Sequence, residues 1–278
     1  MEYAKRLVVP AVLLIILVAS WMSPLDTLSS EQVDAGLKRS LASFAIARSL
    51  NAVISVAQGT DVAIQPAGIG VKFAPGEILD PINDLIETFS TLMLFASISF
   101  GVQKVLISVG GHWLVSVALS LSVLLWAVLH VAGKSIPRWC TALLVVTLLV
   151  RFAVPVATVG SSAMFQQFLA ADYVQSQTFL EQGAEDARKK ALPDTEPPGE
   201  QGLFDRLLPK GKDLNVKDRI NDFRKTAELW TEKMIKLTVV FLLETMIFPL
   251  LLLWGLARLA KGTLDQLSAI PDEYKYKA

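Results

Sequence analysis

The sequence has few residues suited to binding a metal ion or forming a disulfide. Its one cysteine, Cys140, stands within an apolar run, so neither a disulfide framework nor a cysteine-based metal site is predicted. The two histidines, His112 and His130, lie 18 residues apart at opposite ends of one apolar segment. They are too far apart to share an ion, and we expect no metal and no other cofactor.

Charged residues are also scarce, at 19% of the chain, and 26 basic residues balance 26 acidic ones. No global positive field would attract nucleic acid and no nucleic-acid fold signature is present, so nucleic acid is excluded as a partner. Catalytic motifs are missing as well. The segment Gly133-Lys134-Ser135 has Val128 where a phosphate-binding loop needs a glycine. The sequence therefore predicts a protein that is not an enzyme.

Apolar residues are abundant instead, at 53% of the chain, and they are gathered in blocks that hold almost no charge. Blocks of this kind predict lipid-spanning helices rather than one large soluble core. We expect an all-α polytopic membrane protein with four or five transmembrane helices. Short loops and the lack of a eukaryotic targeting signal favour a bacterial inner (plasma) membrane.

The first 83 residues predict an anchor followed by a small domain outside the membrane. Residues 1–22 carry Lys5 and Arg6 before an apolar run, which is typical of a retained transmembrane anchor; a cleaved signal peptide is the alternative. Residues 23–83 are water-compatible and predict an α(+β) cap. Its helix is expected over residues 30–58, with Leu37, Leu41, Phe44, Leu50 and Ile54 on the apolar face. A β-hairpin is expected over residues 62–73.

Residues 84–159 predict transmembrane helices two to four. Asp80-Pro81 is a favourable helix start. The segment from Thr88 to Val109 either crosses the membrane or lies along it, because its uncharged run is short. Gly110-Gly111 predicts a tight turn into a span from Trp113 to Val131, and Trp139 opens the next span.

Residues 160–236 predict a long antiparallel helical hairpin that extends the last two spans beyond the membrane. Its second arm has apolar residues at alternating steps of four and three, the pattern of a coiled-coil seam. The seam consists of Val216, Ile220, Phe223, Ala227, Trp230 and Met234. The last span covers residues 237–258, and residues 259–278 predict a polar tail.

Two topologies remain open at this point. Five crossings place the cap and the hairpin on opposite sides of the membrane. Four crossings, with the segment from Thr88 to Val109 lying along or dipping into the membrane without crossing it, place both outside the cytoplasm. The short basic segments Lys134 to Arg138 and Arg258 to Lys261 would then lie in the cytoplasm, as the positive-inside rule prefers.

Two charges inside apolar runs, Arg151 and Glu244, are the most informative residues, because an unpaired charge in a bilayer is costly. Counted from the hairpin, both lie at the same depth, so we predict an intramembrane Arg151–Glu244 ion pair. Pro155 and Pro249 in the same two helices are candidate hinges or packed kinks.

These features predict a non-enzymatic membrane scaffold or assembly protein. It would act through its hairpin and cap, as a homo-oligomer or with other membrane proteins. The alternative is a channel or transporter subunit that uses the Arg151–Glu244 pair.

Overall fold

The computed structural model describes residues 2–58, 75–132, 136–191 and 216–268. Within these ranges the chain is helical and contains no strand, so the all-α prediction is confirmed. The β-hairpin expected over residues 62–73 and the second half of the tail, residues 269–278, lie outside the described residues.

The first four helices are α1 (Glu2–Met22), α2 (Pro24–Gln58), α3 (Pro75–Gly110) and α4 (Trp113–Val131). The bounds of α4 match the predicted span. The helix expected from residue 30 begins at Pro24 instead, one residue after α1 ends. Asp80-Pro81 lies inside α3, not at its start.

The remaining helices form two long helical segments, each interrupted only by a π-helical turn. One consists of α5 (Arg138–Met164), a π-helical turn η1 (Phe165–Leu169) and α6 (Ala170–Ala191). The other consists of α8 (Val216–Leu242), a π-helical turn η2 (Leu243–Ile247) and α9 (Phe248–Ser268). The sequence predicts both long helices but neither π-helical turn, and α9 continues into the region expected to be a tail.

Four helical segments among the described residues are long and apolar enough to cross a membrane: 80–110, 113–131, 138–186 and 228–262. A bent pair, Ala11–Met22 with Pro24–Ser55, passes the same test when taken together, and its two helices meet at 52°. The chain therefore has the helices of an integral membrane protein.

By its contacts the chain divides into two compact units, which are described separately. Unit 1 contains Met1–Gly36, Ser99–Met164 and Glu244–Ala278; unit 2 contains Leu37–Ile98 and Phe165–Leu243. The divisions between them fall at the two π-helical turns and within α2 and α3.

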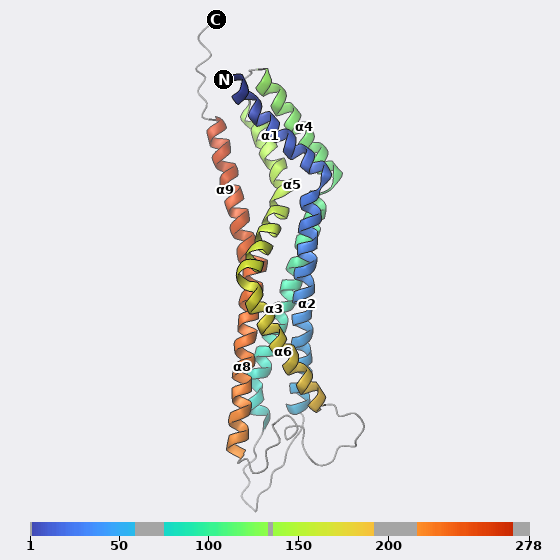
Figure 1. The fold of residues 1–278 in the computed structure, drawn as a ribbon, viewed down its shortest axis with the longest axis vertical. Coiled ribbons are helices and arrows are strands. Elements are labelled where there is room, and N and C mark those ends of the chain that lie inside the picture. The colour runs from blue at the N-terminus through green and yellow to red at the C-terminus, as the bar shows by residue number, and fades with distance from the viewer. Residues whose placement is uncertain (1, 59–74, 133–135, 192–215, 269–278) are drawn as a thin grey trace, which may run out of the picture. The chain divides into compact units, whose positions relative to one another are not determined.

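In unit 1, α4 packs against both α1 and α5, and α5 packs against α9 (Figure 1). Leu13, Leu119, Trp126, Cys140 and Leu144 belong to its buried apolar cluster. The serine hydroxyls Ser20 and Ser116 are hydrogen-bonded 3.2 Å apart. Since the earlier residues of α1 pack on the later residues of α4, these two helices are antiparallel.

The adjoining ends of α2 and α3 in unit 1 are antiparallel too. Asp34 pairs with Lys104, and Gly36 lies against the ring of Phe100. Because α1 and α2 differ in direction by only 52°, their partners α4 and α3 also continue in roughly one direction. The Gly110-Gly111 turn is thus a bend and not the reversal expected of two successive crossings.

Small residues form the middle of the buried face of α2. The predicted apolar face is correct for Leu50 and Ile54, which are buried, and wrong for its first half. Leu41 is 45% exposed, and Leu37 and Phe44 are only partly buried. The buried residues recur at steps of three and four, and small residues here let helices approach closely. They are Val33, Gly36, Ser40, Ser43, Ala47, Leu50 and Ile54.

In unit 2, α6 packs against α8 and α2 runs parallel to α6. The ring of Tyr173 meets Phe241 edge-on at 5.9 Å, and Gly183 lies against Trp230, so α6 and α8 are antiparallel. The Ser43 hydroxyl donates to Gln177, and the Arg39 guanidinium lies over Tyr173. The step from Arg39 to Ser43 along α2 matches the step from Tyr173 to Gln177 along α6. Because both steps run in the same direction, the two helices are parallel.

Candidate functional site

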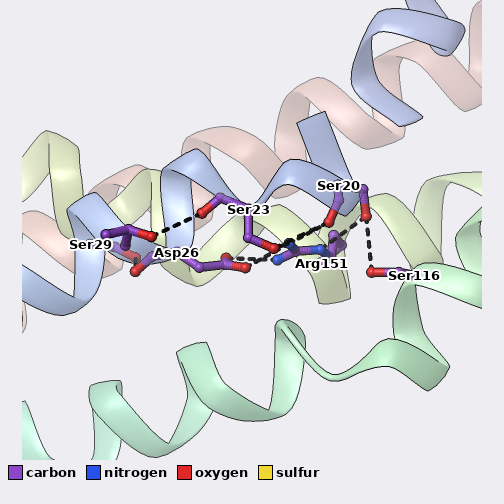
Figure 2. Close-up of polar contacts among 7 residues, drawn as sticks. Ser20, Ser23, Asp26, Ser29, Ser116 and Arg151 are labelled. Atoms are coloured by element: carbon purple, nitrogen blue, oxygen red, sulfur yellow. Dashed lines mark hydrogen bonds and ion pairs between the residues drawn. The ribbon is translucent and has the colours of Figure 1, made fainter. Parts of the chain in front are cut away.

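Arg151 of α5 is 1% exposed and forms a bidentate ion pair with Asp26 of α2 (Figure 2). Its Nη1 donates to Asp26 Oδ1 at 2.7 Å, and its Nη2 donates to Asp26 Oδ2 at 2.6 Å. Two parallel charge-assisted hydrogen bonds fix both the distance and the orientation of the two side chains. The pair therefore ties α5 to the start of α2.

The sequence Ser23-Pro24 explains why a guanidinium is needed at this point. In a continuous helix the Ser20 carbonyl would accept from the N–H of residue 24, but proline has none. Arg151 Nη2 donates to this carbonyl at 2.9 Å, and Nε donates to the Ser20 hydroxyl at 3.0 Å. Arg151 thus replaces the hydrogen bond that the proline removes.

Ser23 carries the backbone strain of this break. Its φ of 53° is in the left-handed region that non-glycine residues rarely adopt. The residue ends α1, and Pro24 then takes the first helical position of α2, where its ring is tolerated. Arg151 Nη2 also donates to the Ser23 hydroxyl at 3.3 Å, so the strained residue is held by the same guanidinium.

The bend between α3 and α4 lies at the same place. A Cβ on Gly110 would lie 2.9 Å from the Val150 carbonyl oxygen, and one on Gly111 would lie 3.1 Å from Asp26 Oδ2. A backbone oxygen cannot move aside as a flexible side chain can. Glycine is therefore required at residue 110 for α3 to approach α5.

Pro155 contributes to this site as well. It is buried inside α5 and does not end the helix. Its missing N–H removes the usual helical partner of the Arg151 carbonyl, which lies one turn earlier. That carbonyl faces Gly110, 3.6 Å from where a Cβ would be. The candidate hinge is thus a packed position next to the ion pair.

Hydroxyl groups extend the network across unit 1. The Ser20 hydroxyl donates to Ser116, and the Ser29 hydroxyl donates to the Asp26 carbonyl (Figure 2). Trp21 donates to Ser120, and Ser122 and Thr147 are hydrogen-bonded. Each contact except that of Ser29 joins two different helices, so these serines serve interhelical packing.

The predicted Arg151–Glu244 pair is wrong, because Arg151 is paired with Asp26. Glu244 is 4% exposed, and its backbone carbonyl accepts from Ser161 at 2.8 Å. Ser161 is ten residues after Arg151, or roughly 15 Å along α5. The prediction of equal depth assumed that each span ends at the base of the hairpin. The helices instead continue without a break through η1 and η2, so those limits do not mark equal depths. Glu244 lies instead within the π-helical turn η2.

The other predicted residues lie apart from this site. Pro249 is buried at the start of α9, directly after η2. In the hairpin seam Met234 is 1% exposed and Trp230 contacts Gly183, as a seam facing α6 requires. For Val216, Ile220, Phe223 and Ala227 only the helical backbone is described.

Sequence reasoning missed Asp26 because it assigned residues 23–83 to a cap outside the membrane. The signal was present: Ser-Pro directly after an apolar helix, with a carboxylate two residues later, indicates a helix break with a charge beside it. What the sequence could not supply is that α3 and α5 meet at the same break.

The site joins α1, α2 and α5 through one ion pair and several hydrogen bonds. The described residues contain no group of three or more His, Cys, Asp or Glu side chains that could hold a metal ion. No protein-family model matches the chain, and no curated protein or solved structure matches it either. Any functional conclusion therefore rests on the residues themselves.

Proposed function

We propose that this chain is a non-enzymatic integral membrane scaffold or assembly protein that works within an oligomer or complex. The observation that carries the proposal is the use of Arg151. All three of its nitrogens donate to oxygens of the same chain, from Ser20, Ser23 and Asp26. A buried charge that is bonded to two other helices in this way supports a role in holding helices together.

We further propose four crossings, each made by one pair of helices: α1 with α2, α3 with α4, α5 with α6, and α8 with α9. The bend at Gly110-Gly111 supports this count, because α3 and α4 keep roughly one direction. In unit 2 the parallel packing of α2 and α6 supports it too, since their ends at Gln58 and Ala191 then lie at the same end of the unit.

Positive charge in the short connections supports one orientation of these four crossings. The segment from Lys134 to Arg138 and the residues Arg258 and Lys261 would lie with the N-terminus in the cytoplasm. The ends of α2 and α6 at Gln58 and Ala191, and the parts of the cap and of the hairpin that extend beyond the bilayer, would then lie on the other side of the membrane.

The mass of the purified membrane particle tests the scaffold proposal. The protein is extracted from native membranes into nanodiscs, and particle mass is measured before and after crosslinking. We expect a homo-oligomer or a complex of fixed stoichiometry. A monomer that recruits nothing would contradict the proposal.

A channel or transporter subunit is the second candidate, favoured by a specific observation. Two bent helix pairs meet at a buried charge pair, and discontinuous helices surround the binding sites of many transporters. Ion flux into proteoliposomes decides between the candidates. Flux that is lost in Asp26→Asn but kept in Asp34→Asn, a change in an exposed ion pair, would favour transport over the scaffold.

A further inference from the structure

The outward face of α2 carries a regular stripe of exposed residues. They recur at the three- and four-residue steps of a heptad, on the side opposite the buried seam of small residues. The stripe consists of Glu31, Lys38, Leu41, Ala45, Arg48, Ala52 and Ser55. A second heptad stripe on one helix indicates a second helix-packing face.

Lipid does not suit this stripe. The exposed face of α3, which pairs with α2, is mostly apolar from Leu94 and Phe95 to Val109, with Lys104 as its one exposed charge. By contrast, the α2 stripe exposes Glu31, Lys38 and Arg48, and charges facing acyl chains are costly. Ala45 and Ala52 on the same stripe leave room for another helix to approach closely. The stripe thus matches a protein helix.

Glu31 and Arg48 are complementary in charge when the stripe is set against itself reversed, and Lys38 then faces Leu41. The acidic residue Glu31 stands at one end and the basic residue Arg48 near the other, with Lys38 and Leu41 at the centre. Reversal about a point between Lys38 and Leu41 brings each Glu31 to an Arg48. A two-fold axis makes that contact twice, as an isologous dimer interface requires.

We propose that α2 is a homodimer interface, in which it packs antiparallel against α2 of a second copy, with Glu31 of each copy facing Arg48 of the other. The inference rests on the proposed scaffold function and names its partner and its surface. The Arg48 guanidinium lies 5.6 Å from the ring centre of Phe44 on the same helix, which keeps it beside the stripe.

Other arrangements of the two helices are less favourable. Parallel pairing in register would set Glu31, Lys38 and Arg48 each against its own copy, and like charges at such positions repel. In the antiparallel pair, sliding one helix along the other by one heptad in one direction sets Lys38 against Arg48. A shift in the other direction sets Lys38 against Asp34, whose carboxylate already pairs with Lys104.

Disulfide crosslinking in membranes tests the geometry. Cys140 is the one cysteine and is buried, so Cys140→Ser gives a cysteine-free background. Leu41→Cys is compared with Ala52→Cys on the same stripe and with Val102→Cys on α3, which is 53% exposed. In the proposed dimer the two copies of residue 41 are offset by about 4.5 Å along the helices, and those of residue 52 by roughly 37 Å.

We expect Leu41→Cys to crosslink at least about tenfold faster than either comparison variant, because a disulfide needs Cα atoms within roughly 7 Å. Equal rates at residues 41 and 52 would indicate parallel helices and overturn the proposal. A faster reaction at residue 102, or crosslinking of residue 41 to a different protein, would also overturn it.

A charge exchange gives a second, independent readout. Arg48→Glu should shift the particle mass toward the monomer, and Glu31→Arg combined with Arg48→Glu should restore the dimer. An oligomer that persists unchanged in Arg48→Glu, with no crosslink at residue 41, would overturn this inference alone. A wild-type monomer without partners would overturn the scaffold proposal as well.

Discussion

At the residue scale, the buried charge of Arg151 is matched by its surroundings. A guanidinium taken out of water costs several kcal/mol, and the cost is offset only with a partner and satisfied hydrogen bonds. Asp26 supplies the charge, while Ser20 and Ser23 supply the remaining acceptors. Such pairs contribute little to stability as a whole but fix one arrangement of the helices.

Removing one partner should therefore cost more than removing both. We expect Asp26→Ala to lower the free energy of unfolding by about 3–5 kcal/mol, because it leaves Arg151 buried and unpaired. The double variant Asp26→Leu with Arg151→Met should recover much of this loss. Denaturant unfolding in detergent micelles measures both.

Asp34→Ala is the matched control for Asp26→Ala. It breaks the Asp34–Lys104 pair, whose side chains are 39% and 49% exposed, and should cost less than about 1 kcal/mol. Similar losses in Asp26→Ala and Asp34→Ala would contradict the special role of the buried pair.

Ser23 permits a second prediction at this scale. Ser23→Gly relieves the strain of its positive φ, whereas Ser23→Ala keeps the strain, and both lose the hydroxyl. We expect Ser23→Gly to be more stable than Ser23→Ala by about 1 kcal/mol, the cost of a left-handed conformation in a non-glycine residue. Thermal unfolding of the two variants side by side tests it, and equal midpoints would argue against the strain.

At the scale of elements, the bends in the two helix pairs depend on small residues and proline. Pro24 ends the hydrogen-bond ladder between α1 and α2, while Gly110 allows α3 to lie against the backbone of α5. These positions set where the helices bend, and Arg151 and Asp26 hold them there.

Gly110→Ala should be destabilising by about 1–3 kcal/mol, the range for overpacking a closely packed contact. Gly101→Ala in the same helix meets nothing within 4 Å and should be neutral or slightly stabilising, since alanine is the better helix former. The difference between the two, measured by unfolding in detergent, tests the close approach. A neutral Gly110→Ala would refute it.

The hairpin seam can be tested with two adjacent residues of α8. Met234 is 1% exposed and Ile235 is 51% exposed. Met234→Ala should cost about 2–5 kcal/mol, as large-to-small changes in packed cores do, and Ile235→Ala much less. If Ile235→Ala proved the more harmful in the same unfolding assay, the seam would face the other way.

At the scale of the whole molecule, the number of crossings decides which surfaces share a side of the membrane. With four crossings, the ends of α2 and α6 lie together outside the cytoplasm and the end of α4 lies inside. With five crossings, the ends of α2 and α6 lie on opposite sides of the membrane.

Cysteine labelling distinguishes these topologies. In the Cys140→Ser background, Ser55→Cys, Glu185→Cys and Ala132→Cys place a thiol at three exposed residues. We expect an impermeant maleimide to label residues 55 and 185 in intact cells, and residue 132 only after permeabilisation. Labelling of just one of residues 55 and 185 in intact cells would support five crossings.

Much of the fold followed from local patterns. The blocks of apolar residues are long enough to require helices in lipid, and the heptad steps from Val216 to Met234 predict a long packed helix. These features depend on neighbours in the chain, so α4 and the helices from Arg138 and Val216 could be predicted closely.

The sequence by itself determined that this chain is an all-helical membrane protein with a charge, Arg151, that needs a partner. Only the tertiary structure decided that the partner is Asp26 and that Gly110-Gly111 is a bend. Helix length and periodicity are local properties, whereas the partner of a buried charge depends on the register between helices far apart in sequence. That register is set by close approaches such as Gly110 on Val150, which no local pattern reports.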